Sequence, residues 1–520
     1  MTPESLSQLL DEFLAGTRTA VVLEDGVVSF DLATARYSIS GEYNKCLLHL
    51  WSAERNVVRR VLDAEVKGGS LRLAVQRMGQ TSPSRLEICR DRDRRSPSAR
   101  RTARSAYEQK LRRVLERRFY GFAISQLSTR MDLERSFGPV YARGLLKKGQ
   151  TAFAVLGVNE QEPQASIDAA LTFGILWLNA SRESQNDRAV VEGLHLFVPP
   201  KSSGIVRERI ARLNRSAAKW LLYEFDERHD DVVEIDCSDC GNVSTRLVRC
   251  PDFERAYERF ASPIAAVKEL LPECDAVVLS PAEVAFRLHG LELARARIAH
   301  SPTSFHSGTE IVFGLGAEER VLEGRNRDEF VRLLHSAGEV RHAEGPRDHP
   351  LWRMHPERWL ESLVVREVDS LDNRLDANQL YSQVPAFSAA DRAMIDVLAV
   401  TRAGRLAVVE LKADEDIHLP LQGIDYWARV QWHHSRGEFK QFGYFEGREL
   451  SSERPLLVLV APALRIHPAT DTLLRFISPE IEWELLGIDE RWRQGVRVVF
   501  RKRAGWKDDP RMMRFSEAAS

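Results

Sequence analysis

Three residues in the C-terminal third of the chain have the types and spacing of a site that acts on phosphate esters. Glu410 and Lys412 are two residues apart in the β-type segment RLAVVELKA, so both side chains project from one face of a strand. Asp396 interrupts the apolar segment RAMIDVLAVT, where a carboxylate is costly unless it is paired or holds a cation. Two carboxylates can bind Mg²⁺, for which Mn²⁺ can substitute, and a lysine beside them can orient or help deprotonate water. The three residues therefore predict metal-assisted attack of water on phosphorus.

The neighbouring segments predict the elements that position these residues. The two β-type segments flank a turn at residues 402–404 and predict a hairpin. An amphipathic helix is expected over residues 357–372 and a strand over residues 380–387. After the hairpin, the pattern predicts a helix that starts near Pro420, a buried strand, a second helix and a last strand. The expected order is therefore α-β-β-β-α-β-α-β.

Asp396, thirteen intervening residues and then Glu410-Leu411-Lys412 resemble the signature of the PD-(D/E)XK nuclease superfamily, which includes restriction enzymes, repair nucleases and RecB-type exonucleases. Residues 357–426 are similar to the nuclease domain of archaeal and actinobacterial endonucleases that act on mismatched or branched DNA. The resemblance implies a mixed sheet flanked by helices. The proline that precedes the first aspartate in the family is absent, since Ile395 stands there.

The resemblance also implies roles for individual residues. A preceding helix in the family often adds an acidic residue, for which Glu361 is the best match and Glu357 the rival. Gln422, four residues before Tyr426, matches a glutamine on the following helix. Asp396, Glu410 and Glu361 are then the expected metal ligands, and the expected catalytic residues are Asp396, Glu410, Lys412, Glu361 and Gln422.

The resulting expectation is a Mg²⁺-dependent deoxyribonuclease, an endonuclease of repair, defence or mobile-element biology with DNA as its partner. RNA remains open as a substrate. The alternative is a catalytically inactive nuclease fold that serves as a DNA-binding or assembly module. Exposed charged residues on a surface hairpin would explain Asp396 and Glu410 less well, because both interrupt apolar segments.

Composition is consistent with several folded domains. The chain has 520 residues, too many for one ordinary domain, and a formal net charge of -1, which argues against a nonspecific polycation. No apolar run approaches the length of a membrane span, and the N-terminus lacks the layout of a signal peptide, so the cytoplasm is the expected compartment. A homodimer, or a protein partner bound through the N-terminal region, is left open.

The predicted fold class is mixed α/β in several domains. The domains expected are a mainly β domain over residues 1–90, an arginine-rich linker over 91–104, a mixed α/β domain over 105–340, and the nuclease-like domain over 355–505. Part of the second domain has an alternative interpretation as a nuclease-like fold that lacks the catalytic residues. The linker is interpreted as a solvated connection, with a phosphate-gripping basic arm as the alternative.

Some local patterns in the first 340 residues carry further predictions. Helical spacing predicts helices near residues 54–66, over residues 205–225 and over residues 282–298. Cys237 and Cys240 have the spacing of one half of a zinc site, but ordinary thiols are favoured because a second pair of ligands is missing. His289 is interpreted as a packing residue.

Overall fold

The computed structural model describes residues 2–15, 20–24, 27–32, 35–42, 45–51, 56–67, 70–76, 83–90, 97–132, 137–184, 189–238, 245–298, 308–315, 319–388 and 392–504. Within these ranges the fold is a mixture of helices and strands in four sheets, as expected for a mixed α/β protein. Two compact units are formed, one by Met1–Gln109, Glu283–Phe286 and Glu292–Leu334, the other by Lys110–Ala282, Arg287–Leu291 and His335–Ser520.

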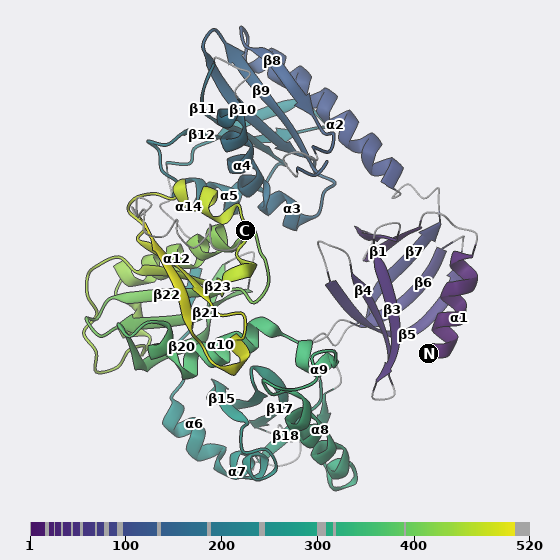
Figure 1. Ribbon diagram of the computed structural model, residues 1–520, viewed down its shortest axis with the longest axis vertical. Coiled ribbons are helices and arrows are strands. Elements are labelled where there is room, and N and C mark those ends of the chain that lie inside the picture. The colour runs from purple at the N-terminus through teal and green to yellow at the C-terminus, as the bar shows by residue number, and fades with distance from the viewer. Residues whose placement is uncertain are drawn as a thin grey trace, which may run out of the picture. The chain divides into compact units, whose positions relative to one another are not determined.

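The N-terminal segment forms an antiparallel sheet in the order β2-β1-β7-β6-β5-β4-β3, whose core includes side chains of one helix (Figure 1). The elements are α1 (Pro3–Leu14), β1 (Ala20–Glu24), β2 (Val27–Asp31), β3 (Arg36–Glu42), β4 (Lys45–Trp51), β5 (Asn56–Lys67), β6 (Ser70–Gln76) and β7 (Ser84–Arg90). The helix predicted near residues 54–66 is wrong, since β5 lies there. β5 pairs with β4 and β6 on its two sides, and its β-branched residues Val57, Val58 and Val61 favour that pairing.

A second sheet follows, in the order β13-β12-β11-β10-β9-β8. Its elements are α2 (Pro97–Arg118), β8 (Ala123–Ser128), β9 (Tyr141–Lys148), β10 (Thr151–Val158), α3 (Gln164–Asp168), α4 (Ala170–Glu183), β11 (Val190–Val198), α5 (Ser203–Ile210), β12 (Lys219–Asp226) and β13 (Asp231–Ile235). α2 begins inside the segment interpreted as a linker, of which residues 91–96 lie outside the described residues. The long helix predicted over residues 205–225 is also wrong, because α5 ends at Ile210 and the apolar residues from Trp220 onward form β12.

A third sheet has the order β15-β16-β17-β18-β19. The elements around it are α6 (Phe253–Arg259), α7 (Ala261–Leu270), β15 (Asp275–Ser280), β16 (Glu283–Leu288), β17 (Leu291–Ile298), β18 (Thr309–Phe313), β19 (Arg320–Val321), η1 (Gly324–Asn326) and α8 (Arg327–Val340). The helix predicted over residues 282–298 is wrong: this segment forms β16 and β17. Its turn is made by His289 and Gly290, which both have positive φ and therefore end a helical pattern.

The fourth sheet, in the order β14-β20-β21-β22-β23-β24-β25, contains the predicted site residues Asp396 and Glu410. Its elements are β14 (Thr245–Leu247), α9 (Pro350–Arg353), α10 (Pro356–Arg366), α11 (Val368–Leu371), β20 (Leu375–Ser388), β21 (Arg392–Thr401), β22 (Leu406–Leu411), α12 (Leu419–Ser435), α13 (Glu438–Gln441), β23 (Leu456–Pro462), η2 (Ala463–Arg465), α14 (Thr470–Arg475), β24 (Trp483–Ile488), η3 (Trp492–Gln494) and β25 (Val498–Arg503). The predicted order from α10 to β24 is confirmed. The sequence analysis missed the short helices and both edge strands, β14 and β25.

Helices cover both faces of this fourth sheet (Figure 1). α12 contacts β22 and β23, and its apolar residues share a core with Leu406 and Val408. α10 contacts β20, β21 and β22, and its residues share a separate core with Val409 and Leu411. Alternate residues of β22 therefore point to different helices, as strand geometry requires.

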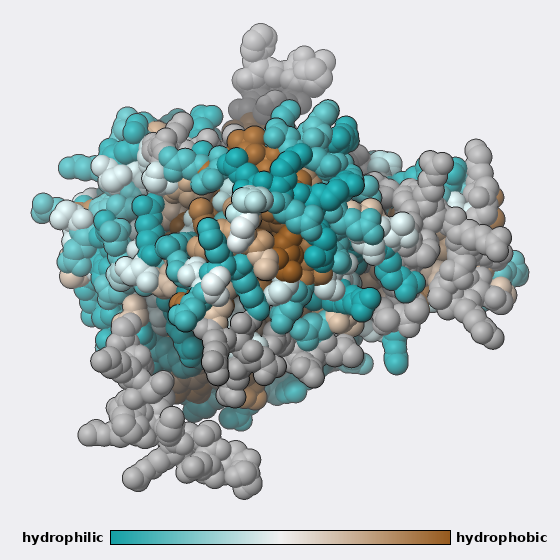
Figure 2. Space-filling model, turned by 90° about the horizontal axis from the view of Figure 1, so that it is seen from above, coloured by the Kyte–Doolittle hydropathy of each residue, from teal (hydrophilic) through white to brown (hydrophobic). Residues whose placement is uncertain are grey.

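Within the described residues, no helix is both long and apolar enough to cross a membrane. Figure 2 shows one face of the molecule, on which hydrophilic side chains cover most of the area and apolar side chains form smaller groups between them. The large apolar side chains are mainly buried in the cores of the sheets.

Candidate active site

Asp396 and Glu410 lie opposite each other on neighbouring antiparallel strands. Val397 of β21 pairs with Val409 of β22, so Asp396 and Glu410 follow one residue further along. Directly opposed residues of antiparallel strands project from the same face, and the charge of Asp396 accordingly contributes to the raised pKa of Glu410. The backbone N–H of Leu411 donates to Oδ2 of Asp396 at 3.0 Å and fixes its orientation.

Lys412 lies directly after β22, and its side chain is buried together with that of Glu410. Its ammonium group donates to Oε1 of Glu410 at 3.2 Å. Two further carboxylates lie near this cation: Oε1 of Glu357 at 3.8 Å and Oδ2 of Asp416 at 4.0 Å. The structure thus brings Asp396, Glu410 and Lys412 together, and these three residues are called the carboxylate–lysine site below.

Burial gives the carboxylates of this site unusual protonation equilibria. The side chain of Glu410 is 1% exposed, and burial together with the charge of Asp396 raises the pKa of Glu410 well above its ordinary value. Burial also raises the pKa of Asp396, although the Leu411 N–H and the charge of Lys412 oppose the shift. Burial lowers the pKa of Lys412, but the surrounding carboxylates outweigh it and hold that pKa above its usual range.

The donor set of the carboxylate–lysine site fits a hard divalent cation. Oε2 of Glu410 is buried and accepts no hydrogen bond from any residue that the structure describes, so one buried acceptor oxygen is free. Within the described ranges, no three His, Cys, Asp or Glu side chains converge into a closed metal cage. Mg²⁺ does not require one, since it commonly binds one or two carboxylates and keeps several waters. Asp396 and Glu410 could therefore hold such an ion.

Of the two candidates on α10, Glu361 is the more buried and Glu357 the closer to the lysine. The carboxylate of Glu361 accepts hydrogen bonds from Arg358 at 3.1 Å and from the side chain of Gln383. Burial raises the pKa of Glu361 to about 8, with the charge of Asp396 adding to the shift and Arg358 opposing it. Burial also raises the pKa of Glu357, whose ammonium partner is Lys412. Both glutamates thus border the site.

Gln383 is a site residue that sequence reasoning missed. Ser382 pairs with Val397 and Val384 with Ile395, so Gln383 of β20 lies opposite Asp396. Its φ of 54° is unusual for a residue with a side chain, and its buried Oε1 has no hydrogen-bond partner among the described residues. A glutamine inside the segment LYSQVPAF gives no sequence signal for this conformation. Strained backbone and an unpaired buried oxygen mark this position as part of the site.

The predicted pair on α12 is also close to the site. Nε2 of Gln422 donates to the hydroxyl of Tyr426 at 3.3 Å, as the four-residue spacing predicts. Burial raises the pKa of Tyr426 to about 12, and the next largest cause is the charge of Glu410. α12 therefore brings a hydroxyl and an amide to the face of β22 that carries Glu410.

The position of α10 depends on a buried arginine that follows α8. Arg341 is fully buried, donates to the backbone carbonyls of Leu288, His289, Leu351 and Met354, and lies 4.7 Å from the ring centre of Trp359 on α10. The ring of His289 stacks on Trp359 as well, at 4.9 Å. The interpretation of His289 as a packing residue is confirmed by this stacking. The segment 337–356 therefore contributes buried side chains to the core, among them Arg341 and Leu351.

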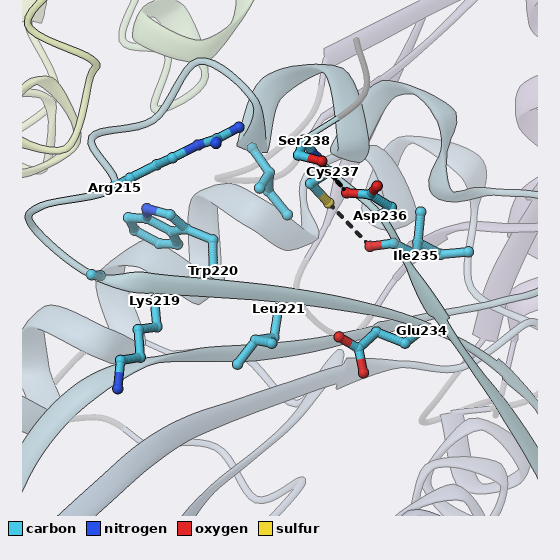
Figure 3. Close-up of a pocket in the computed structure, with 11 residues that line it drawn as sticks. Arg215, Lys219, Trp220, Leu221, Glu234, Ile235, Asp236, Cys237 and Ser238 are labelled. Carbon is cyan, nitrogen blue, oxygen red and sulfur yellow. Dashed lines mark hydrogen bonds between the residues drawn. The ribbon is translucent and has the colours of Figure 1, made fainter.

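A groove of about 670 Å³ lies elsewhere, at the edge of the second sheet (Figure 3). Its lining includes two cations, Arg215 and Lys219, and two anions, Glu234 and Asp236. This balance does not favour a polyanion. The thiol of Cys237, also in the lining, points to the carbonyl of Ile235 at 3.5 Å, whereas Cys240 lies outside the described residues.

A comparison of the sequence with models of protein families and with curated proteins finds no match.

Proposed function

We propose that this chain is a divalent-metal-dependent nuclease that hydrolyses phosphodiester bonds in DNA, and that it acts as an endonuclease. The observation that supports the proposal is the buried contact of Lys412 Nζ with Glu410 Oε1 at 3.2 Å, beside Asp396, whose carboxylate accepts from the N–H of Leu411 between them. Burying a charged pair beside a further carboxylate is costly, and such a cluster with shifted pKa values is typical of a catalytic site. The resemblance to PD-(D/E)XK nucleases supports the same function.

Asp396 and Glu410 would hold Mg²⁺ or Mn²⁺, with Glu361 as an additional acidic group beside them. When bound, the ion supplies positive charge to the developing charge on the phosphate and lowers the pKa of water. The raised pKa values of all three carboxyls fit this role, because burial disfavours their charged forms and a bound cation would stabilise those forms.

Residues of the chain would orient the substrate and the water and exchange protons. The Lys412 ammonium can donate hydrogen bonds to a phosphate oxygen and to the attacking water, and thereby orient both for in-line attack. Glu361, whose pKa burial raises to about 8, is suited to exchange a proton near neutral pH. Gln422 and Tyr426 provide polar groups on the α12 side that support the site and can contact the substrate.

The test is cleavage of supercoiled plasmid in Mg²⁺ or Mn²⁺ by wild-type protein, Asp396→Asn and Lys412→Met. Each variant should lose at least about 100-fold in rate, since each removes a group that acts only at the reacting centre. Matched controls are Asp369→Asn, an exposed carboxylate 3.1 Å from Arg402, and Lys440→Met, an exposed lysine; both should cut at the wild-type rate.

Other outcomes point to other functions. Binding of DNA without cleavage in either metal would favour an inactive nuclease fold that serves in DNA binding or assembly. Cleavage that is equal in wild type and in both site variants would contradict the assignment of the site. RNA of the same sequence, offered in parallel, decides which polymer is cut.

A further inference from the structure

The second and fourth sheets have the same topology. β8-β9-β10-β11-β12-β13 and β20-β21-β22-β23-β24-β25 follow the same order. In each, the first three strands pair antiparallel, the next two pairs are parallel and the last pair is antiparallel. The crossover helices also correspond, with α4 at the position of α12 and α5 at the position of α14. Agreement in all five pair directions indicates two copies of one fold.

At the described strand positions that correspond to Asp396 and Glu410, the copy built on the second sheet has no carboxylate. β10 corresponds to β22, and α4 corresponds to α12. On the face of β22 that packs against α12 lies Glu410, whereas the same face of β10, which packs against α4, carries the apolar residues Leu156 and Val158. Strand β9 of this copy carries Tyr141 and Arg143, where β21 carries Asp396. Arg143 pairs with Leu156 in the sheet, and its buried guanidinium donates to the carbonyls of Gly138 at 2.6 Å and Arg130 at 2.5 Å. A fixed cation here opposes binding of a metal ion.

The two copies contact each other in a reciprocal manner. α5 packs against α12, and α4 packs against α14 (Figure 1). Since α4 corresponds to α12 and α5 to α14, the two contacts are equivalent, each joining the first crossover helix of one copy to the second crossover helix of the other. The segments that follow α5 and α14 meet in an antiparallel bridge between Leu213 and Ile477. Across it the N–H of Asn214 donates to Phe476 at 2.8 Å and that of Ser478 to Arg212 at 2.9 Å. Reciprocal contacts of this kind are the property of a twofold interface.

The contact between the copies is buried and specific. Arg209 of α5 pairs with Asp425 of α12 at 2.8 Å, and Thr172 of α4 hydrogen-bonds His418, the residue before α12, at 3.2 Å. Trp220 packs edge-on against Phe476, with ring centres 5.6 Å apart. This helical face of the catalytic copy is therefore already covered from within the chain.

We infer that residues 110–235 are a catalytically empty copy of the nuclease fold, paired with the catalytic copy about an internal pseudo-twofold axis, so that the chain has one cutting centre and nicks one strand of a duplex. This inference rests on the proposed function for its chemistry. Twofold nucleases match the twofold symmetry of duplex DNA and can place one centre on each strand. A pair with one centre cuts one strand in each encounter.

The test of the strand count uses wild-type protein, Mg²⁺ and supercoiled plasmid in molar excess over the protein. Nearly all plasmid should become open-circular before linear DNA appears, at a rate that is first order in protein. Linear DNA formed directly from supercoiled plasmid, or a rate that is second order in protein, would overturn the inference and leave the nuclease intact. Absence of any cleavage would contradict the proposed nuclease function, and the inference that one strand is cut would fall with it.

The pairing itself is tested in the full chain without reference to activity, by hydrogen exchange of Leu213→Asp. The amides of Asn214 and Ser478 should be protected in the wild type and should both exchange at least about 10-fold faster in the variant. Unchanged protection of β10 and β11 shows that the empty copy is still folded. The control is Leu464→Asp, at an exposed position, which should change neither amide. Unchanged exchange at Ser478 in Leu213→Asp would overturn the internal pairing.

Discussion

The ammonium group of Lys412, the residue directly after β22, lies 3.2 Å from Oε1 of Glu410 inside that strand, and both side chains are buried. This contact has a direct consequence for stability, because each group depends on the other to be charged inside the protein. Glu410 also faces Asp396, so the lysine compensates two carboxylates.

Replacement of Lys412 by methionine should therefore destabilise the fold in a pH-dependent way. The loss expected is about 3 kcal/mol when a buried charge loses its partner. The loss of stability should be larger at pH 9 than at pH 6, because the strongly raised pKa of Glu410 favours its neutral form as the pH falls, and the neutral form has no unpaired charge. Urea unfolding at both values measures this. Lys502→Met, which breaks a surface pair with Asp471, should cost less than about 0.5 kcal/mol at either pH. If Lys412→Met lowered the free energy of unfolding equally at both pH values, the stability would not depend on charge pairing between Lys412 and the carboxylates.

The metal-free protein should lose stability as pH rises from about 5 to about 9. The folded-state pKa of Glu361 is about 8, above its unfolded value, so the folded state holds the proton more tightly and loses that advantage as pH increases through this window. Asp396 and Glu410 shift in the same direction. Glu361→Gln should flatten the dependence, and Mg²⁺ should restore stability at high pH. Thermal unfolding with EDTA or Mg²⁺ provides the measurement; a flat wild-type profile would refute the prediction.

Substitutions of Gln383 should separate backbone strain from hydrogen bonding. Gln383→Ala removes the donor to Glu361 and keeps a Cβ at φ 54°, whereas Gln383→Gly removes both donor and strain. The alanine variant should be less stable than wild type by about 1–3 kcal/mol, and the glycine variant should recover about 1 kcal/mol of that loss. Both should reduce cleavage. Wild-type cleavage by both variants would show that Gln383 does not support the site.

The buried pair of Arg209 and Asp425 should couple the two copies of the fold energetically. Asp425→Ala leaves a buried guanidinium without its carboxylate and should cost about 3–5 kcal/mol. Arg209→Met should lower the free energy of unfolding by less than Asp425→Ala does. The variant with both substitutions should be more stable than Asp425→Ala alone. A double-mutant cycle from denaturant unfolding gives the coupling energy, for which at least about 1 kcal/mol is expected. Strict additivity would mean that the pair contributes no interaction energy.

Gly290 should be the most sensitive glycine near α10. It has φ 73°, and a Cβ added there would lie 2.1 Å from the backbone carbonyl oxygen of Arg358. Gly290→Ala must therefore move α10, which carries Glu361, and we expect at least about 3 kcal/mol of destabilisation and reduced cleavage. The comparison is Gly437→Ala, which also has positive φ but open space around it, and which should cost about 1 kcal/mol. Similar losses in the two variants would exclude a steric cause.

The sequence by itself was sufficient to predict most of the sheet that carries Asp396 and Glu410. Alternation along RAMIDVLAVT and RLAVVELKA is local, so the hairpin, the order of elements from α10 to β24 and the meeting of Asp396, Glu410 and Lys412 could all be predicted. The predictions of helices over residues 54–66 and 282–298 were wrong. The local spacing of apolar residues in these segments fits both a helix and a strand, and pairing with other strands of the sheet favours the strand.

Only the tertiary structure decided which distant residues complete the site and how the rest of the chain is used. The strained backbone of Gln383, the Arg341 contacts that hold α10 and the reciprocal bridge of Leu213 with Ile477 all join segments far apart in sequence. The two copies share strand order and pair directions, and these depend on hydrogen bonds between strands. Such bonds leave no periodic signal along the chain. For this reason the sequence suggested a second nuclease-like fold only as an alternative, and the strand order and pair directions that indicate the repeat come from the tertiary structure.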